Sequence, residues 1–103
     1  MFVFIETKLF TRLAGEYLAD DELSNLQQYL NENPEAGDII RESGGVRKVR
    51  WGVGDRGKSS GLRIIYQLRS RQGEIWFPTL HAKNVAGSIS GKILRKIKEE
   101  IDG

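Results

Sequence analysis

The chain has 103 residues, which suits a single domain, residues 1–103, with one two-layer core. It has no cysteine and one histidine, which excludes disulfides, thiolate metal sites and histidine clusters, so we expect neither a metal nor another cofactor. No apolar run approaches the roughly 20 residues of a transmembrane helix, and the apolar start lacks the preceding positive charges of a signal peptide. We therefore expect a cytoplasmic protein that makes no contact with a membrane.

The first 45 residues predict a short strand, two helices and a loop. Phe2 to Ile5 is continuously apolar, as in a buried strand. A first amphipathic helix follows Thr7, a candidate N-cap, and carries an apolar stripe made of Phe10, Leu13, Ala14 and Tyr17. A second helix, capped by Asp20 or Asp21 and stopped by Pro34, carries a stripe made of Leu23, Leu26 and Leu30. Residues 35–45 read as a polar loop.

The second half predicts three strands, at 46–51, 62–68 and 74–83. Side chains alternate between the two faces of a strand, so Lys48 and Arg50 share one face of the first, and Arg63 lies opposite the apolar face of the second. The same alternation in the third strand puts one group of side chains on the face away from Trp76 and Leu80, namely Ile75, Phe77, Thr79, His81 and Lys83. Pro78 indicates an edge strand or a bulge.

A last helix is predicted from Ser88 or Ser90, because isoleucines recur at every fourth position from Ile89 to Ile101. The order of elements is β-α-α-β-β-β-α. It predicts an α+β domain in which an antiparallel sheet, with a three-stranded meander, is covered by an N-terminal helix hairpin and a C-terminal helix. The place of the first strand in the sheet is left open.

Charge is distributed unevenly along the chain. The stretch from Arg47 to Arg71 holds eight basic residues and one acid, Asp55, whereas residues 1–46 hold three basic and nine acidic residues. A concentrated positive segment in an acidic frame points to a polyanionic partner.

A glycine-rich loop, Gly52 to Gly61, joins the two most basic strands. Gly52, Gly57, Lys58 and Ser59 have the spacing of a phosphate-binding loop, but that motif requires a helix directly after the loop. Here Gly61 and a β-branched strand follow, so nucleotide binding is rejected and the segment is interpreted as a hairpin loop.

The basic side chains of the strands suggest a phosphate site. Lys48, Arg50 and Arg63 on neighbouring antiparallel strands would repel one another unless an anion neutralised them. Each alone is more often a solvated surface residue, whereas the whole set favours nucleic-acid binding. RNA cleavage without a metal needs a base, an acid and cations, and His81 is the side chain suited to proton transfer near neutral pH. A single histidine in a strand is nevertheless more often structural.

At these residues the chain resembles the RelE/HigB superfamily of bacterial type II toxins, which are ribosome-dependent messenger-RNA endonucleases. The resemblance lies in residues 46–51, the Gly/Lys loop, residues 61–68 and the Lys83-Asn84 pair, and it covers essentially the whole chain. The run Gly-Val-Arg-Lys-Val-Arg and the Lys-Asn pair are most similar to the HigB-type branch. The chain departs from RelE in having Asn84 after the lysine, where RelE has an arginine, and Ser90 where RelE has a tyrosine.

The resemblance implies a microbial-RNase-like fold that enters the ribosomal decoding site and cuts messenger RNA there. Lys48 and Arg50 match cations implicated in proton transfer and charge stabilisation, Arg63 matches the arginine that holds the scissile phosphate, and His81 takes an acid or base role. We expect further contacts with RNA or the ribosome from Arg47, Arg56, Lys58, Arg69, Lys83 and Asn84. The implied partners are the ribosome, messenger RNA and a cognate antitoxin, which alone binds operator DNA.

Two other functions stay open. A ParE-like relative would share the fold and poison DNA gyrase, although the cationic set argues for cleavage. A noncatalytic RNA-binding or regulatory domain would use the same basic surface without cutting.

Overall fold

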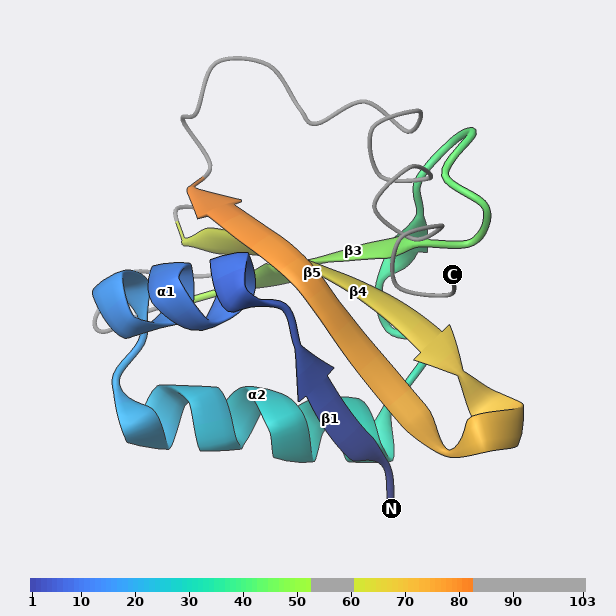
Figure 1. The fold of residues 1–103 in the computed structure, drawn as a ribbon, viewed down its shortest axis with the longest axis horizontal. Coiled ribbons are helices and arrows are strands. Elements are labelled where there is room, and N and C mark those ends of the chain that lie inside the picture. The colour runs from blue at the N-terminus through green and yellow to red at the C-terminus, as the bar shows by residue number, and fades with distance from the viewer. Residues whose placement is uncertain (53–60, 83–103) are drawn as a thin grey trace.

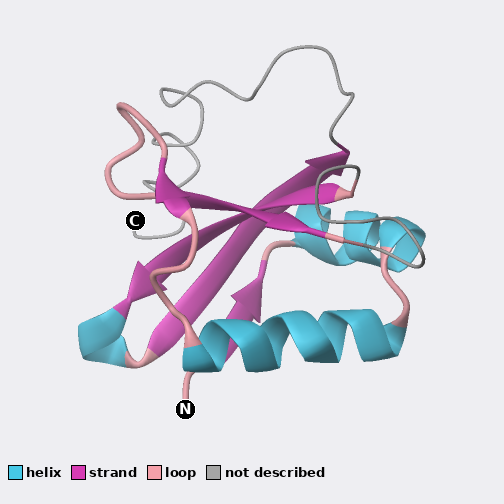
Figure 2. Cartoon of the chain, turned by 180° about the vertical axis from the view of Figure 1, so that it is seen from behind, coloured by secondary structure: helices cyan, strands magenta, loops and turns pink. Residues whose placement is uncertain are grey.

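A computed structural model describes residues 1–52 and 61–82 of the chain. In this part the protein is an α+β structure, with a mixed five-stranded sheet and two α-helices. Both views of the ribbon place the two helices on the same side of the sheet (Figures 1 and 2). No helix among these residues is long and apolar enough to cross a membrane. The predicted helix beyond residue 87 lies outside the described residues.

The sheet has the order β1-β5-β4-β3-β2. Its strands are β1 (Val3–Glu6), β2 (Asp38–Ile39), β3 (Arg47–Trp51), β4 (Leu62–Arg69) and β5 (Glu74–Ala82). β3, β4 and β5 pair antiparallel, which confirms the predicted meander, and a 3-10 turn, η2 (Ser70–Gln72), joins the last two. β1 pairs parallel to β5, so the expectation of an antiparallel sheet is wrong for this strand. β2 is a second correction, because residues 35–45 were expected to form only a loop.

Local chemistry explains where the helices begin. In α1 (Lys8–Tyr17) the Thr7 side chain accepts a hydrogen bond from the Phe10 N–H at 3.0 Å, as an N-cap does. The same hydroxyl donates to the Pro78 carbonyl at 2.7 Å and so ties α1 to β5. α2 (Asp20–Glu32) has Ala19 at its N-cap, not Asp20 or Asp21 as predicted. The Glu22 carboxylate accepts the Ala19 N–H at 2.9 Å and so satisfies the backbone donor of the N-cap residue, although the alanine side chain itself caps nothing.

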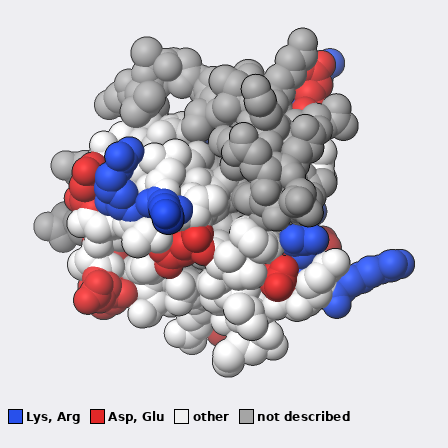
Figure 3. All heavy atoms as spheres, viewed as in Figure 1, with Lys and Arg blue, Asp and Glu red and all other residues white. Residues whose placement is uncertain are grey.

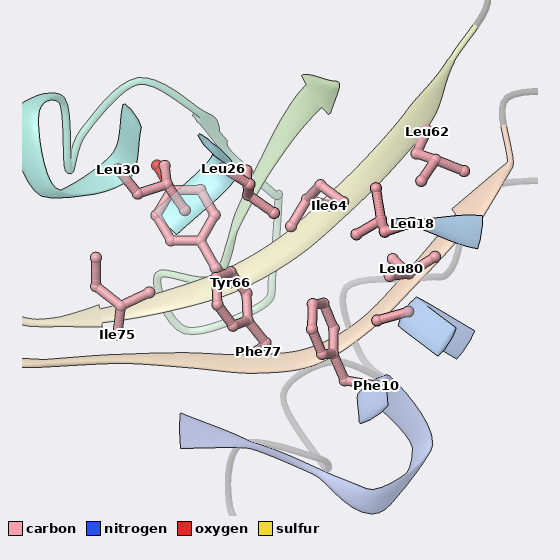
Figure 4. Packing of buried hydrophobic residues seen from close by; sticks show 11 residues of the cluster. Phe10, Leu18, Leu26, Leu30, Leu62, Ile64, Tyr66, Ile75, Phe77 and Leu80 are labelled. Atoms are coloured by element: carbon pink, nitrogen blue, oxygen red, sulfur yellow. The ribbon is translucent and has the colours of Figure 1, made fainter. Parts of the chain in front are cut away.

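The core lies between the helices and one face of the sheet (Figure 4). Phe77 is fully buried and stacks between two other aromatic rings, with centroids 5.6 Å from Phe4 and 4.6 Å from Phe10. The apolar stripes predicted for the two helices meet this face through their buried members, namely Phe10, Ala14, Leu26 and Leu30. Burial of such side chains at about 25 cal/mol per Å² is the main term that holds the sheet to the helices.

A β-bulge at Pro78 reverses the faces of β5. Ile65 pairs with Thr79 but Gln67 pairs with Trp76, so two residues of β5, Phe77 and Pro78, stand opposite one residue of β4. Pro78 therefore marks a bulge in a strand that lies between two others, and the edge-strand alternative is wrong. Its missing N–H falls beyond the last residue paired with β1.

The bulge corrects the predicted faces of β5. Strict alternation put Ile75 and Phe77 on one face with His81, and Leu80 on the other. In the structure Ile75, Phe77 and Leu80 all belong to the helix-covered core. His81 pairs with Arg63, on the face that points away from the helices. The extra residue at the bulge is what allows both halves of the strand to bury their apolar side chains on one side.

Candidate functional site

A row of basic side chains crosses the sheet on the face away from the helices. Arg50 on β3 stands directly opposite Arg63 on β4, and Arg63 stands directly opposite His81 on β5. Lys48 lies two residues before Arg50 and therefore points to the same face. The register confirms the prediction that Lys48, Arg50 and Arg63 share a face, and the bulge at Pro78 adds His81 to them. We call these four residues the cationic row.

Three members of the cationic row, Lys48, Arg50 and Arg63, line a hollow of about 530 Å³. The residues that line the hollow are Ala36, Asp38, Lys48, Val49, Arg50 and Arg63. Arg50 is exposed, whereas Lys48 and Arg63 are half-buried, so the site combines an accessible cation with two that are held closer to the sheet. Three cations and one carboxylate line this concave surface, and the excess of positive charge favours an anionic ligand.

The positive charges of the row are not neutralised within residues 1–52 and 61–82. Arg50 and Arg63 face each other across the strands, an arrangement that destabilises a sheet. Among the described residues no ion pair joins Lys48, Arg50 or Arg63 to a carboxylate, and the Arg63 Nη1 atom is buried without a hydrogen-bond partner. A buried guanidinium nitrogen without a partner costs free energy that a bound phosphate oxygen would recover.

The loop that precedes β2, beside the hollow, is anchored by hydrogen bonds to Tyr66 and Arg47. The hydroxyl of Tyr66 accepts the Gly37 N–H at 2.9 Å and donates to the Pro34 carbonyl at 2.8 Å. Burial raises the pKa of Tyr66 above its ordinary value, so the ring remains a neutral donor. Arg47 donates to the Gly37 carbonyl at 2.8 Å and to the Glu35 carbonyl at 3.3 Å.

Gly37 allows this loop to approach β3 closely. A Cβ at Gly37 would lie 2.8 Å from the carbonyl oxygen of Lys48 and 3.0 Å from the Tyr66 ring, so a larger residue would force the loop away. The close approach brings the next residue, Asp38, into register with Lys48 as part of β2. Asp38 thereby becomes part of the lining of the hollow.

The structure separates two other predicted contact residues, Arg47 and Arg69, from the cationic row. Arg47 points to the opposite face of β3 from Lys48 and holds the loop carbonyls described above. Arg69 lies at the far end of β4, with its guanidinium 3.9 Å from the Glu74 carboxylate and 5.9 Å from the centre of the Trp76 ring. Arg56, Lys58, Lys83 and Asn84 lie outside the described residues.

Trp51 and Tyr66 contribute to packing and do not belong to the cationic row. Tyr66 is fully buried, and Trp51 packs against the core with its ring 5.4 Å from that of Tyr29. Figure 3 views the molecule from the side on which α1, β1 and β5 lie in front, and basic and acidic atoms are interspersed there. Within the described ranges, no three histidine or carboxylate side chains gather as metal ligands.

Sequence reasoning missed Asp38. It stands in what read as a polar loop, and the two-residue strand that carries it has no periodicity. The available signal was Gly37, because a glycine before a polar residue and a short apolar pair can mark a close backbone approach.

Comparison with models of known protein families finds none that matches this chain.

Proposed function

We propose that this chain is a RelE/HigB-like toxin of a type II toxin–antitoxin system, an endonuclease that cuts messenger RNA on the ribosome without a metal ion. The observation that carries the proposal is the cationic row, with Arg50, Arg63 and His81 in register across three strands and Lys48 on the same face. The description of the fold as RelE-like is part of the same proposal.

The chemistry of the row suits cleavage of a ribose-phosphate chain. A phosphate bound between Arg50 and Arg63 would relieve the repulsion between the two guanidinium groups. The same groups would stabilise the extra negative charge of the phosphorane transition state. Loss of one such donor from a catalytic site typically slows a reaction by about 10²–10³-fold.

Proton transfer would be carried out by His81, at the end of the cationic row. The Nδ1 atom of His81 lies 3.0 Å from the carbonyl oxygen of Ala82, and a proton on Nδ1 is donated there. The other ring nitrogen, Nε2, is then the one available to substrate. A gyrase poison would have no need of this combination of phosphate-binding arginines and a titratable group, and that difference favours the nuclease over a ParE-like activity.

The partners follow from the same proposal. The ribosome presents messenger RNA in the decoding site, and a cognate antitoxin covers the cationic row until it is removed. Contact with operator DNA occurs through the antitoxin only. The uneven charge of the chain supports polyanionic partners, because its basic residues concentrate in the strands that form the row.

The test is induction of the chain in bacteria, followed by mapping of messenger-RNA ends by primer extension. The expected result is growth arrest with codon-registered cuts on translated messages. Arg63→Ala should abolish the cuts, whereas Arg12→Ala, which removes an exposed arginine from α1, should leave them intact. Arrest with intact messages and damaged DNA would support gyrase poisoning instead, and growth without arrest would support a noncatalytic binding domain.

A further inference from the structure

One carboxylate lies among the cations of the hollow. Asp38 on β2 is directly opposite Lys48 on β3, and it is the one acidic residue among the described residues that line this site. The order across the sheet is therefore Asp38, then Lys48 and Arg50, then Arg63, then His81. A carboxylate and an imidazole, two groups that serve as acid or base in catalysis, thus lie on opposite sides of the arginine pair, with Asp38 displaced along the strands from the line that His81 shares.

Cleavage of RNA through its own 2′-hydroxyl is an in-line displacement. The attacking 2′ oxygen and the leaving 5′ oxygen lie on opposite sides of phosphorus, so the base and the acid must flank the phosphate from opposite sides. Asp38 and His81 are three strand intervals apart, about 14 Å across the strands, and Asp38 is also displaced by two residues along them, because it pairs with Lys48 and not with Arg50. The two side chains would therefore approach a phosphate held by the arginines from diagonally opposite sides.

We infer that Asp38 is the general base of the proposed reaction and that His81 is its general acid. The inference rests on the proposed function and adds to it a catalytic residue and an assignment of roles. After the reaction the imidazole of His81 is neutral and the carboxyl group of Asp38 is protonated. Exchange with solvent returns both groups to their starting states.

The step balances in atoms and charge. The Asp38 carboxylate takes the proton of the 2′-hydroxyl as the 2′ oxygen forms its bond to phosphorus. The bond from phosphorus to the 5′ oxygen breaks, and the Nε2 proton of the His81 imidazolium goes to that oxygen. The products are a 2′,3′-cyclic phosphate and a free 5′-hydroxyl, and no oxidant, reductant or metal is consumed.

A simpler interpretation of Asp38 is that it forms an ordinary surface pair with Lys48. Such cross-strand pairs contribute little, and no ion pair joins these two side chains in the part of the chain that the structure describes. The backbone before Asp38 is instead held at Gly37, by the buried Tyr66 hydroxyl, the half-buried Arg47 guanidinium and the close approach of Gly37 to β3. This support fits a side chain that must be held at a defined place relative to the row.

The first experiment measures the pH dependence of single-turnover cleavage on ribosomes programmed with a defined message. Asp38→Asn should slow cleavage by about 10²–10⁴-fold and remove the acidic limb of the profile. Asp38→Glu should restore part of the rate and the limb. Asp21→Asn, the same change at an exposed site in α2, should behave as wild type.

The charged groups that face Asp38 are Lys48 and Arg50 from β3 and Arg63 from β4, and Arg63 also faces His81.

The second experiment separates base from acid. A message with sulfur in place of the scissile 5′ oxygen has a leaving group that needs no protonation. This substrate should rescue His81→Gln to within about tenfold of wild type, and it should leave Asp38→Asn slow.

Rescue of Asp38→Asn but not of His81→Gln would overturn the assignment by exchanging the two roles. An Asp38→Asn rate within threefold of wild type, with its acidic limb intact, would overturn the role of Asp38 while leaving the proposed nuclease in place. Failure of the wild-type protein to cut any ribosome-bound message would overturn both proposals.

Discussion

The two faces of β4 show how differently one strand is used. On the side of the helices, Leu62, Ile64 and Tyr66 are buried in a continuous apolar core. On the other side, Arg63 stands between Arg50 and His81, so two guanidinium groups and an imidazole are neighbours across the strands. The apolar residues of the first face lower the free energy of the folded state, and the opposed arginines of the second raise it. This difference indicates that the cationic row does not contribute to stability, which fits the binding role proposed for it.

The small contacts on the open face support the same comparison. Ile65 is 1% exposed, because it packs against Val46 and Ile40 from the loop that precedes β3. This cluster holds the loop without extending over the hollow beside Arg63. Substitutions on the covered face should therefore change stability, and substitutions in the row should change activity.

The largest effect is expected from Phe77→Ala on the covered face. Removal of a fully buried ring stacked between Phe4 and Phe10 should reduce the free energy of unfolding by about 3–5 kcal/mol, because a cavity replaces the lost contacts. Urea unfolding followed by circular dichroism measures this change. Tyr17→Ala, at a side chain that is 43% exposed, is the control and should cost far less. Equal losses at the two sites would mean that the core does not lie where the structure has it.

The next effect is on activity and should come without loss of structure. Lys48→Ala combined with Arg50→Ala should reduce cleavage of ribosome-bound messages by at least about 10²-fold, because two groups that stabilise the phosphorane charge are gone. Neither side chain belongs to the covered face, so the unfolding midpoint should remain close to that of wild type. Collapse of the circular dichroism spectrum would contradict the division between the two faces.

Tyr66→Phe tests the connection between the faces. Loss of the hydroxyl leaves the buried Gly37 N–H without its acceptor and should cost about 1–3 kcal/mol of stability. Cleavage should also slow, because Asp38 is positioned through this loop. Arg12→Ala, in exposed α1 surface, provides a variant with neither change expected.

Tyr66→Phe also tests how stability depends on pH. Burial raises the pKa of Tyr66, so the folded state favours the protonated phenol. Its contribution to stability is complete below the ordinary tyrosine pKa of about 10 and is lost as the pH rises through the higher value of the folded state. The stability difference between wild type and Tyr66→Phe should therefore shrink above pH of about 10 in urea titrations. A difference that stays constant up to pH 11 or so would contradict this account of the hydroxyl.

The smallest effect is expected in the loop on the open face. Glu42 has a φ of 62°, in the left-handed region that glycine adopts without strain. Glu42→Gly should stabilise the protein by about 0.5 kcal/mol, the strain relieved minus the added entropy of the unfolded chain. Gln28→Gly, in the middle of α2, should instead destabilise it by about 1 kcal/mol. Thermal unfolding resolves the two signs, and a loss at both sites would show that the backbone of Glu42 is unstrained.

Much of the sheet could be predicted because its central strands carry their own signals. Alternation in β3 and β4 was sufficient to place Lys48, Arg50 and Arg63 on one face, and the leucine stripe of α2 identified Leu26 and Leu30 as core residues. These patterns are local, and burial on one face fixes them.

The errors lie where non-local pairing decides the structure. Nothing in residues 3–6 specifies a parallel partner some seventy positions later in the chain, and a two-residue strand such as β2 is too short to have a pattern. Pro78 signalled an irregularity, but the resulting change of face depends on how β4 and β5 are aligned. In the candidate site, the position of His81 relative to the core depends on the alignment of β4 and β5, and the presence of Asp38 depends on the very short strand β2. Neither could therefore be predicted from the sequence.

The parallel pairing of the first strand has a consequence for synthesis of the protein. Val3 pairs with Glu74, so the edge of the sheet formed by β1 stays incomplete until the ribosome has made β5. His81 is translated later still, and folding that depends on contacts this distant along the chain is slow compared with helix formation. A nascent chain should thus expose its β1 and helices well before its cationic row exists as a surface. Under the proposed nuclease function, that order would protect the translating ribosome from its own product.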